Sequence, residues 1–228
     1  MKKRSIFYKH RIFILIFIVI SIIILISFYN ILTPEKKLPI FQPAEVNYKL
    51  VDSSFQHIKR FHKIGDFKLV NQNGKLISQE SYNGKIYIAD FFFTTCPSIC
   101  PVMTGNMLKI QNKIINDPSI MLISYSVDPE NDSVDKLKEY AIEKGIIDSK
   151  WNLVTGDKKE IYDLARKSYF VAEINEDEGL NEIIHTENFV LIDPDKRIRG
   201  YYDGTNYQEI NKLLEDIVIL KKEYKMNN

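Results

Sequence analysis

Residues 86–101 read Ile-Tyr-Ile-Ala-Asp-Phe-Phe-Phe-Thr-Thr-Cys-Pro-Ser-Ile-Cys-Pro, and this stretch decides the fold. Its first half, Ile86 to Phe93, is an apolar run broken only by Asp90, which predicts a fully buried central strand. Cys96-Pro97 follows, and a proline at the first position of a helix loses no hydrogen bond. The pattern therefore predicts a strand that leads directly into a helix reaching about Asn116.

Further strands and helices alternate on either side of this stretch. Asn73-Gly74 separates two short apolar segments, which is the signal for a hairpin. The order of the elements predicts an α/β fold, a thioredoxin-like sandwich with an added amino-terminal hairpin. The expected strands are 67–70, 75–77, 120–127, 151–154, 189–192 and 198–202, and the further helices are 133–144, 157–167 and 207–222.

The run from Ile12 to Tyr29 is apolar except for Ser21 and Ser27. Because a helix needs roughly 20 apolar residues to cross a bilayer, we predict one transmembrane anchor over residues 12–32. A cleaved signal peptide and a buried core helix are the alternatives. A signal peptide has an apolar stretch of about 7–15 residues and a small-residue cleavage site, whereas this run ends in bulky side chains.

The charges around the predicted anchor indicate its orientation. Residues 1–11 hold five basic residues and no acidic one, so we expect them to form a cytoplasmic tail. Residues 33–60 contain three prolines and little periodicity, as expected for a spacer. Residues 61–225 would then form the thioredoxin-like domain on the periplasmic, extracytoplasmic side of the membrane.

The overall charge excludes one class of partner. The rest of the chain, after residue 11, contains 26 basic and 30 acidic residues. A mildly acidic body lacks the basic surface that nucleic acid requires, so we expect no nucleic-acid partner.

The two cysteines, Cys96 and Cys100, both lie in the part predicted to be exported. Outside the cytoplasm such a pair is a disulfide candidate. At a helix start, however, unpaired N–H groups stabilise a thiolate. Four residues along a helix also place Cβ atoms about 5–6 Å apart, whereas a disulfide needs about 3.5–4.5 Å. We therefore favour a metal-binding or redox pair over an inert bridge.

His185 is the candidate for a third ligand. It lies four residues before the strand expected at 189–192. In a thioredoxin-like fold the loop entering that strand packs beside the cysteines, and ordinary thioredoxins carry a cis-proline there. Two thiolates and one imidazole suit copper(I), whereas zinc in a structural site would normally take a fourth protein ligand. A solvated loop histidine is the alternative.

Several motifs together resemble the Sco/SenC family. Residues 94–101, Thr-Thr-Cys-Pro-Ser-Ile-Cys-Pro, are similar to its T-x-C-P-x-x-C-P signature. Residues 126–132, Ser-Val-Asp-Pro-Glu-Asn-Asp, resemble its V-D-P-x-x-D segment, and Thr155-Gly156-Asp157 fits its L-T-G segment. His185 with the apolar strand and hairpin after it resembles the family's histidine block. The matches occur in order over about residues 61–220.

This resemblance implies a function. It implies a copper ion bound by Cys96, Cys100 and His185. It also implies that copper, or reducing equivalents, pass to the binuclear copper centre of a cytochrome c oxidase subunit. Other copper carriers or thiol reductants would then be partners. Against the pattern we expect of the family, Asp90 occupies a position usually small or apolar.

Asp90 lies six residues before Cys96, the spacing of the buried aspartate of ordinary thioredoxins. Two interpretations remain open. Asp90 points to a polar edge or bonds a neighbouring backbone group, or it has a raised pKa and accepts a proton during thiol–disulfide exchange.

Other polar residues are weaker candidates. Asp128 ends a strand at the carboxyl edge of the sheet, where sites form, and we consider it partner-facing, although Asp-Pro is also an ordinary strand stop. His57 and His62 are expected on the solvated surface. Met103 and Met107 follow the cysteines at helical spacing, and we interpret them as core rather than as copper ligands.

Three functions remain in competition. The first is a membrane-anchored copper chaperone and thiol-redox factor, which is not primarily an enzyme. The second is an exported thiol–disulfide oxidoreductase without a role in copper delivery. The third is a tethered module whose cysteines only staple a helix. The absent cis-proline, the cysteine spacing and His185 favour the first function, whereas Asp90 and the thiolate at the helix start leave the second open.

Overall fold

The computed structural model describes residues 3–32, 36–46, 50–51, 57, 61–172 and 186–226. The chain divides into two units, one ending at Lys36 and the other beginning at Lys37. The first contains the helix α1 (Lys3–Leu32), whose segment from His10 to Tyr29 is long and apolar enough to cross a membrane. None of that segment is buried within the structure.

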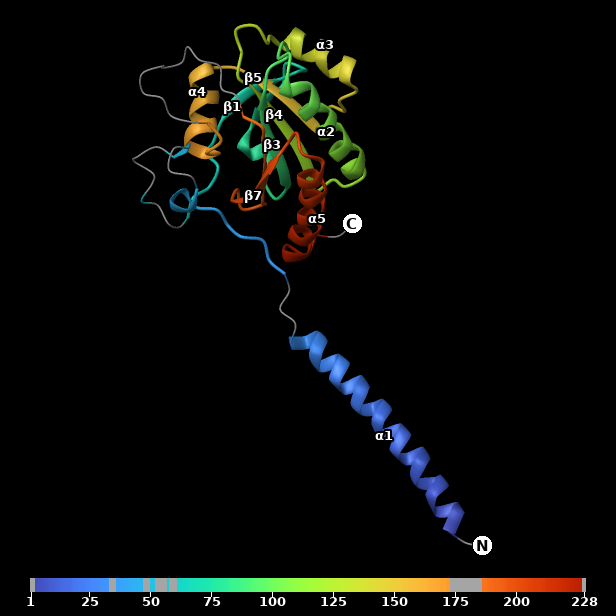
Figure 1. Ribbon diagram of the computed structural model, residues 1–228. Coiled ribbons are helices and arrows are strands. Elements are labelled where there is room, and N and C mark those ends of the chain that lie inside the picture. Colours follow the sequence, from blue (N-terminus) through green and yellow to red (C-terminus); the bar gives the residue numbers. More distant parts are fainter. Residues whose placement is uncertain are drawn as a thin grey trace. The chain divides into compact units, whose positions relative to one another are not determined.

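The described residues of the second unit form a seven-stranded sheet in the order β2-β1-β5-β4-β3-β6-β7 (Figure 1). The central strands β3, β4 and β5 are parallel, and every other neighbouring pair is antiparallel. The strands are β1 (Lys68–Asn71), β2 (Leu76–Ser78), β3 (Ile86–Phe92), β4 (Ile120–Ser126), β5 (Trp151–Thr155), β6 (Asn188–Ile192) and β7 (Ile198–Asp203).

Helices cover both faces of this sheet. Figure 1 shows α2 and α5 on one side and α4 on the other. The helices of this unit are α2 (Ile99–Ile114), α3 (Val134–Lys144), α4 (Lys158–Asp163) and α5 (Tyr207–Glu223), with a π-helical turn η4 (Leu164–Ser168) after α4 and short 3-10 turns η1 (Pro43–Glu45) and η3 (Gln79–Tyr82).

Strand β3 lies at the centre of the core. All seven of its residues are buried, including Asp90. Successive side chains of a strand point to opposite faces. Phe92 therefore contacts Tyr140 of α3, with 5.7 Å between ring centroids, whereas Phe91 stacks on Tyr125 at 5.0 Å on the opposite face. The apolar run that leads into the cysteines thus places them at the end of a fully buried strand.

Most of the predicted elements are confirmed. Both hairpins form, and Gly74 adopts the left-handed φ of 70° that the first turn requires. Gly145, with φ of 76°, ends α3 as expected.

The predicted start of the cysteine helix is wrong. Helix α2 begins at Ile99, so Cys96 and Pro97 lie in a turn before it and only Cys100 is helical. Ser98, the residue before the helix, has φ of −120° and ψ of −85°, which are not helical angles, so the helix does not extend back to Cys96. The helical Cβ spacing that argued against a disulfide consequently does not apply to this pair.

Part of the predicted spacer packs on the domain. The N–H of Leu38 donates to Oε1 of Glu223 at 2.6 Å, and the N–H of Phe41 donates to the carbonyl of Ile198 at 2.9 Å. The guanidinium of Arg199, a residue only 2 % exposed, donates to the carbonyls of Leu38 and Pro39 at 2.8 and 2.9 Å. Residues 37–46 therefore belong structurally to the second unit.

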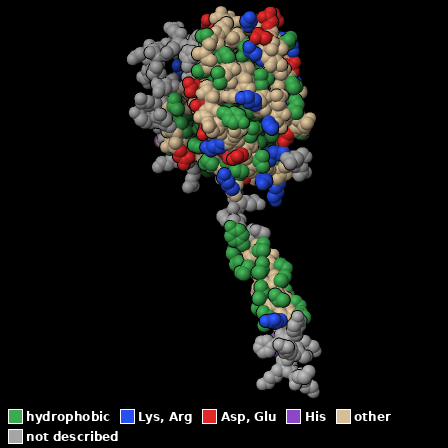
Figure 2. All heavy atoms as spheres, turned by 45° about the vertical axis from the view of Figure 1, so that its right-hand side comes forward, with side chains coloured by type: hydrophobic (Ala, Val, Ile, Leu, Met, Phe, Trp, Pro, Cys, Tyr) green, Lys and Arg blue, Asp and Glu red, His purple; other side chains and the backbone are tan. Residues whose placement is uncertain are grey.

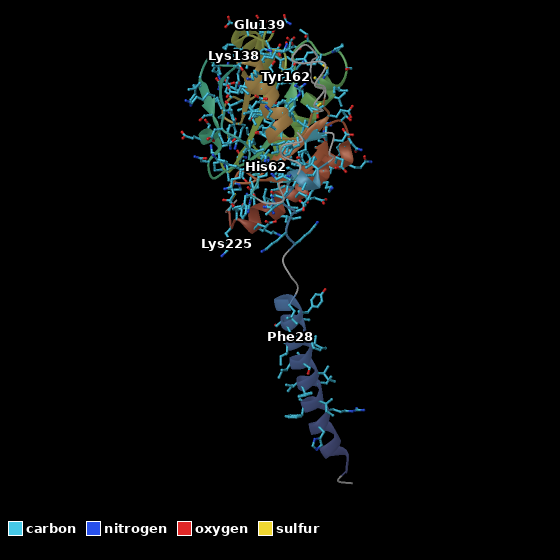
Figure 3. The ribbon with its side chains drawn as sticks, turned by 90° about the vertical axis from the view of Figure 1, so that its left-hand side faces the viewer. Phe28, His62, Lys138, Glu139, Tyr162 and Lys225 are labelled. Carbon is cyan, nitrogen blue, oxygen red and sulfur yellow. The ribbon has the colours of Figure 1, made fainter. Side chains whose placement is uncertain are left out.

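The two histidines that were expected on the solvated surface behave differently. His57 is exposed, as expected. The expectation for His62 is wrong, because it is 9 % exposed, its ring contacts Phe170, and its Nε2 lies 2.8 Å from the carbonyl of Ser168 (Figure 3). Burial lowers the pKa of His62, and it acts as a packed side chain under the π-helical turn.

Candidate metal centre

Cys96 and Cys100 lie together beyond the carboxyl end of β3. Both are free thiols, 6 % and 4 % exposed. Cys100 occupies the first turn of α2, and the N–H of Cys96 donates to the carbonyl of Phe93 at 3.3 Å. Sγ of Cys96 also lies 3.9 Å from Oγ of Ser98. The two sulfurs share one small region at the start of a helix.

A buried carboxylate fixes the turn that carries Cys96. Asp132 has 0 % exposure and accepts hydrogen bonds from the N–H and Oγ1 of Thr94 at 3.1 and 2.5 Å. It also accepts from Oγ of Ser126 at 2.5 Å. Asp132 thus joins the segment two residues before Cys96 to the end of β4. The sequence showed Asp132 only as the last residue of the V-D-P-x-x-D segment, without this role.

The two thiols have opposite pKa shifts. Burial raises the pKa of Cys96, but the hydrogen bond from the Cys100 thiol and the N–H groups of Ser98 and Cys100 outweigh it and lower the net value. Burial and the hydrogen bond to Cys96 raise the pKa of Cys100 to about 12. These N–H groups come from the start of α2, so they provide the expected stabilisation of a thiolate at a helix start.

Asp90 lies beneath the cysteines in the core. It is 2 % exposed and accepts a hydrogen bond from Oγ of Ser124, which in turn accepts one from Nε1 of Trp151 at 2.8 Å. Burial raises the pKa of Asp90 to about 7. Its charge contributes to the raised pKa of Cys100, so the carboxyl and this thiol are electrostatically coupled. Asp90 does not lie at a polar edge.

His185 lies outside the described residues, but the segment that follows it is bound to the cysteine helix. Nδ2 of Asn106, on α2, donates to the carbonyl of Gly204 at 2.7 Å, and the N–H of Gly204 donates to the carbonyl of Glu187 at 2.6 Å. A Cβ at position 204 would lie 2.8 Å from Cε1 of Phe189, so this close approach requires glycine. Glu187, two residues after His185, is thereby linked to α2 through Gly204.

The remaining candidates have ordinary surroundings. Asp128 is 7 % exposed, and its carboxylate accepts two hydrogen bonds from Nδ2 of Asn131 at 2.9 and 3.1 Å. Met103 and Met107 are fully buried in the core, as interpreted from the sequence. The partner-facing role of Asp128 stays a prediction.

The donor set suits a soft metal ion. Within the described ranges no three His, Cys, Asp or Glu side chains form a metal cluster, so the two thiols supply only part of a site. Cys96 has a lowered pKa, which favours the thiolate that a metal requires. An incoming ion would stabilise the second thiolate by its own charge. Two adjacent thiolates fit copper(I) with one further ligand from the chain.

Comparison with known proteins identifies the relatives of this chain. The SCO1/SenC family matches residues 56–220. The chain belongs to this family. The SCO1 protein homolog of Bacillus subtilis (strain 168) is 35 % identical over 158 residues, which are 68 % of this chain and 81 % of that protein.

Solved structures of the family share the fold. BsSco, described as having a disulfide switch and as a member of the Sco family of cytochrome c oxidase assembly proteins, has a TM-score of 0.60 at 34 % identity, covering 70 % of this chain and 93 % of that one. Arabidopsis thaliana ScoI, solved with copper bound, has a TM-score of 0.54 at 28 % identity, covering 68 % and 97 %. These matches confirm the predicted thioredoxin-like α/β fold.

Proposed function

We propose that this protein is a membrane-anchored copper chaperone and thiol-redox factor. It helps to assemble the binuclear copper centre of cytochrome c oxidase, and copper is its cargo. Cys96, Cys100 and His185 are the ligands. The relationship to copper-bound Sco proteins and to oxidase assembly proteins supports this proposal.

The observation that carries the proposal is the paired thiols. Cys96 and Cys100 are free, buried and hydrogen-bonded to each other, and one has a lowered pKa. An inert disulfide would need no such stabilisation of a thiolate. The link from Asn106 through Gly204 to Glu187 ties the chain just after His185 to the helix that carries Cys100.

Competitive titration of the reduced protein with copper(I) tests this proposal. We expect one tightly bound ion per chain in the parent protein. In His185→Ala the affinity should fall by at least about 100-fold, because even the loss of an outer-shell partner of a metal weakens binding about 10–100-fold. His57→Ala is the matched control, since His57 is an exposed histidine that is not among the proposed ligands, so this variant should bind copper like the parent.

Two outcomes would contradict the proposed site. Equal affinity in the parent and in His185→Ala would remove His185 from the ligands. Weak binding in all three proteins, with the thiols shown to be reduced, would leave the cysteines without a role in copper binding.

Asp90 favours a second candidate, an exported thiol–disulfide oxidoreductase. In such a reaction the Cys96 thiolate attacks a disulfide of the partner, and Cys100 must lose its proton before it resolves the mixed disulfide. A carboxyl whose pKa is raised to about 7 can accept that proton near neutral pH. If Asp90→Asn reduced a disulfide substrate at the parent rate with the parent pH profile, this role would be wrong.

The proposed location follows from α1. Its apolar segment from His10 to Tyr29 crosses the membrane, and the basic residues before it hold the amino terminus in the cytoplasm. The domain then lies on the extracytoplasmic side. An alkaline phosphatase fused after residue 228 should be active, because that enzyme needs an oxidising compartment. An inactive but full-length fusion would contradict this orientation.

A further inference from the structure

One end of the domain gathers four segments that are distant in the sequence. Tyr224, the residue after α5, donates from its OH to Oδ2 of Asp195 at 2.7 Å, and the N–H of Ile64 donates to the carbonyl of Lys196 at 2.8 Å. Leu38 is bonded to Glu223 at the same end. We call this end the basic pole, made of residues 37–42, 61–66, 193–197 and 221–226.

The basic pole carries an excess of positive charge. Figure 2 shows Lys and Arg side chains gathered at the lower end of the domain, the end at which Figure 3 labels Lys225. Asp66 and Asp195 pair with Lys196 and Arg197 at 3.4 and 3.0 Å. Asp193 and Glu223, whose side chains are 0 % and 13 % exposed, bond to Arg199. The exposed or half-exposed basic residues are Lys37, Lys63, Lys196, Arg197, Lys222 and Lys225.

Apolar side chains project among these charges. Phe61 is 90 % exposed, and Ile40 is 37 % exposed. The two line one shallow hollow together with Lys63 and Arg197. Phe61 also has a φ of 69°, a left-handed conformation that is strained for a bulky residue. An exposed aromatic ring on a strained backbone, beside a second exposed apolar side chain and basic residues, makes this hollow a candidate contact surface.

The strand directions place the basic pole opposite the cysteines. Tyr87 near the start of β3 pairs with Ile192, whereas the far end of β3 leads to Cys96. Ile192 precedes the turn of the basic pole, so the length of the sheet separates this pole from the thiols. Five residues separate Leu38 from Leu32, the last residue of α1. The chain therefore leaves the domain toward its proposed anchor at the basic pole.

We propose that the basic pole docks on the anionic phospholipid surface of the membrane that the anchor crosses. This proposal rests on the membrane anchoring proposed above. The lysine and arginine side chains contact lipid phosphates, while Phe61 and Ile40 enter the boundary between headgroups and acyl chains. Docking in this way turns the cysteine end of the domain away from the bilayer and toward soluble parts of a partner.

The test uses the full chain in nanodiscs, one set of phosphatidylcholine and one set with half phosphatidylglycerol. Amide hydrogen exchange is measured for peptides covering 61–64 and 222–226. In the anionic discs exchange should slow by at least about fivefold, the factor that one basic residue near an anionic surface supplies. The triple variant Phe61→Ser, Lys63→Glu, Lys225→Glu should lose this protection.

A control variant, with exposed residues changed near the cysteine end, tests whether any change of exposed side chains would remove the protection. Tyr207 is a 61 % exposed aromatic residue at the start of α5, near the cysteine end, and the Lys136 side chain is 49 % exposed. Tyr207→Ser with Lys136→Glu should keep the protection. If the chain does not migrate with the discs, both the anchor and the docking are wrong. If it inserts but the basic pole exchanges equally fast in both lipids, only the docking is wrong.

Discussion

Two side chains of the same type acquire different chemistry from their surroundings in this site. Cys96 faces N–H groups of the helix start and the thiol of Cys100, which favour its thiolate. Cys100 is more deeply desolvated, donates to Cys96 and feels the charge of Asp90, so its pKa rises to about 12. In the proposed thiol–disulfide exchange, Cys96 is therefore the thiol that attacks first, and Cys100 keeps its proton until the first bond has formed.

Alkylation of the reduced protein checks this difference. At pH 8 iodoacetamide should modify Cys96 well before Cys100, because the thiolate is the nucleophile and only Cys96 has a lowered pKa. Peptide mass mapping at successive times measures the two rates. Cys100→Ala is the informative control, since it removes the thiol hydrogen bond to Cys96 and should raise the pKa of Cys96. Modification of Cys100 first, or at an equal rate, would contradict the assignment.

Asp90 makes stability depend on pH in a defined direction. Its pKa is about 7 when folded and 3.8 without burial, so between these values the folded state binds more protons. Its contribution to stability is complete below about pH 4 and is lost as the pH rises through 7. We expect the free energy of unfolding of the parent to fall across this window relative to Asp90→Asn, by roughly 4 kcal/mol in total.

Trp151 reports this transition, because it is the one tryptophan of the sequence, is 1 % exposed and bonds to the same Ser124 as Asp90. Urea unfolding of residues 37–228, followed by its fluorescence between pH 4 and 8, gives the two stability curves. Parallel curves for the parent and Asp90→Asn would mean that Asp90 ionises normally.

At the scale of the elements, the apolar runs and the glycine and proline positions predicted most of the sheet. Runs such as 120–127 reveal buried strands because every residue of a central parallel strand is inside. The start of α2 was not predictable in the same way. Cys96-Pro97 has the pattern of a first helical turn, but a contact with Asp132, 36 positions after Cys96, holds the preceding segment as a turn.

The same limit applies to the functional site. The cysteine pair was recognisable from its spacing along the chain, whereas the apolar run around Asp90 left two interpretations of this residue open. The link between Asn106, Gly204 and Glu187 joins three elements that only the folded sheet brings together. The packing of residues 37–46 was not predicted, because the prolines and charges of this stretch are typical of a spacer. The partners of Leu38, on β7 and α5, lie about 160 and 185 positions away in the sequence.

Asp132 should position the turn between β3 and α2. In Asp132→Asn an amide nitrogen replaces one acceptor oxygen, so Thr94 or Ser126 loses a buried partner. We expect about 1–3 kcal/mol of lost stability and a pKa of Cys96 that moves back toward its ordinary value. The pH profile of alkylation at Cys96 measures this second effect, which a loss of stability alone would not produce.

Asp135→Asn is the matched control for this change. Asp135 is an exposed aspartate in the first turn of α3, three residues after Asp132. Its variant should keep the parent alkylation profile. If Asp132→Asn also kept that profile while losing stability, Asp132 would be a structural residue without influence on the thiol.

At the scale of the whole molecule, the two ends of the domain have separate tasks. The carboxyl end of β3 carries the thiols, and the opposite end binds residues 37–42 and gathers basic side chains. Arg199 joins this second end, because it bonds the carbonyls of Leu38 and Pro39 as well as Asp193 and Glu223. A single buried guanidinium thus connects β7, the end of α5 and residues 37–42, which we call the tether.

Arg199→Met should free the tether from the domain. Because Asp193 and Glu223 are 0 % and 13 % exposed in their side chains, removing their buried partner should lower the free energy of unfolding by about 3–5 kcal/mol. Trypsin should also cut faster after Lys37, since Leu38 and Pro39 lose the bonds that hold them. Lys212→Met, on the exposed side of α5, should change neither measurement. A parent-like rate of cleavage in Arg199→Met would show that Leu38 and Phe41 hold the tether through their backbone bonds alone.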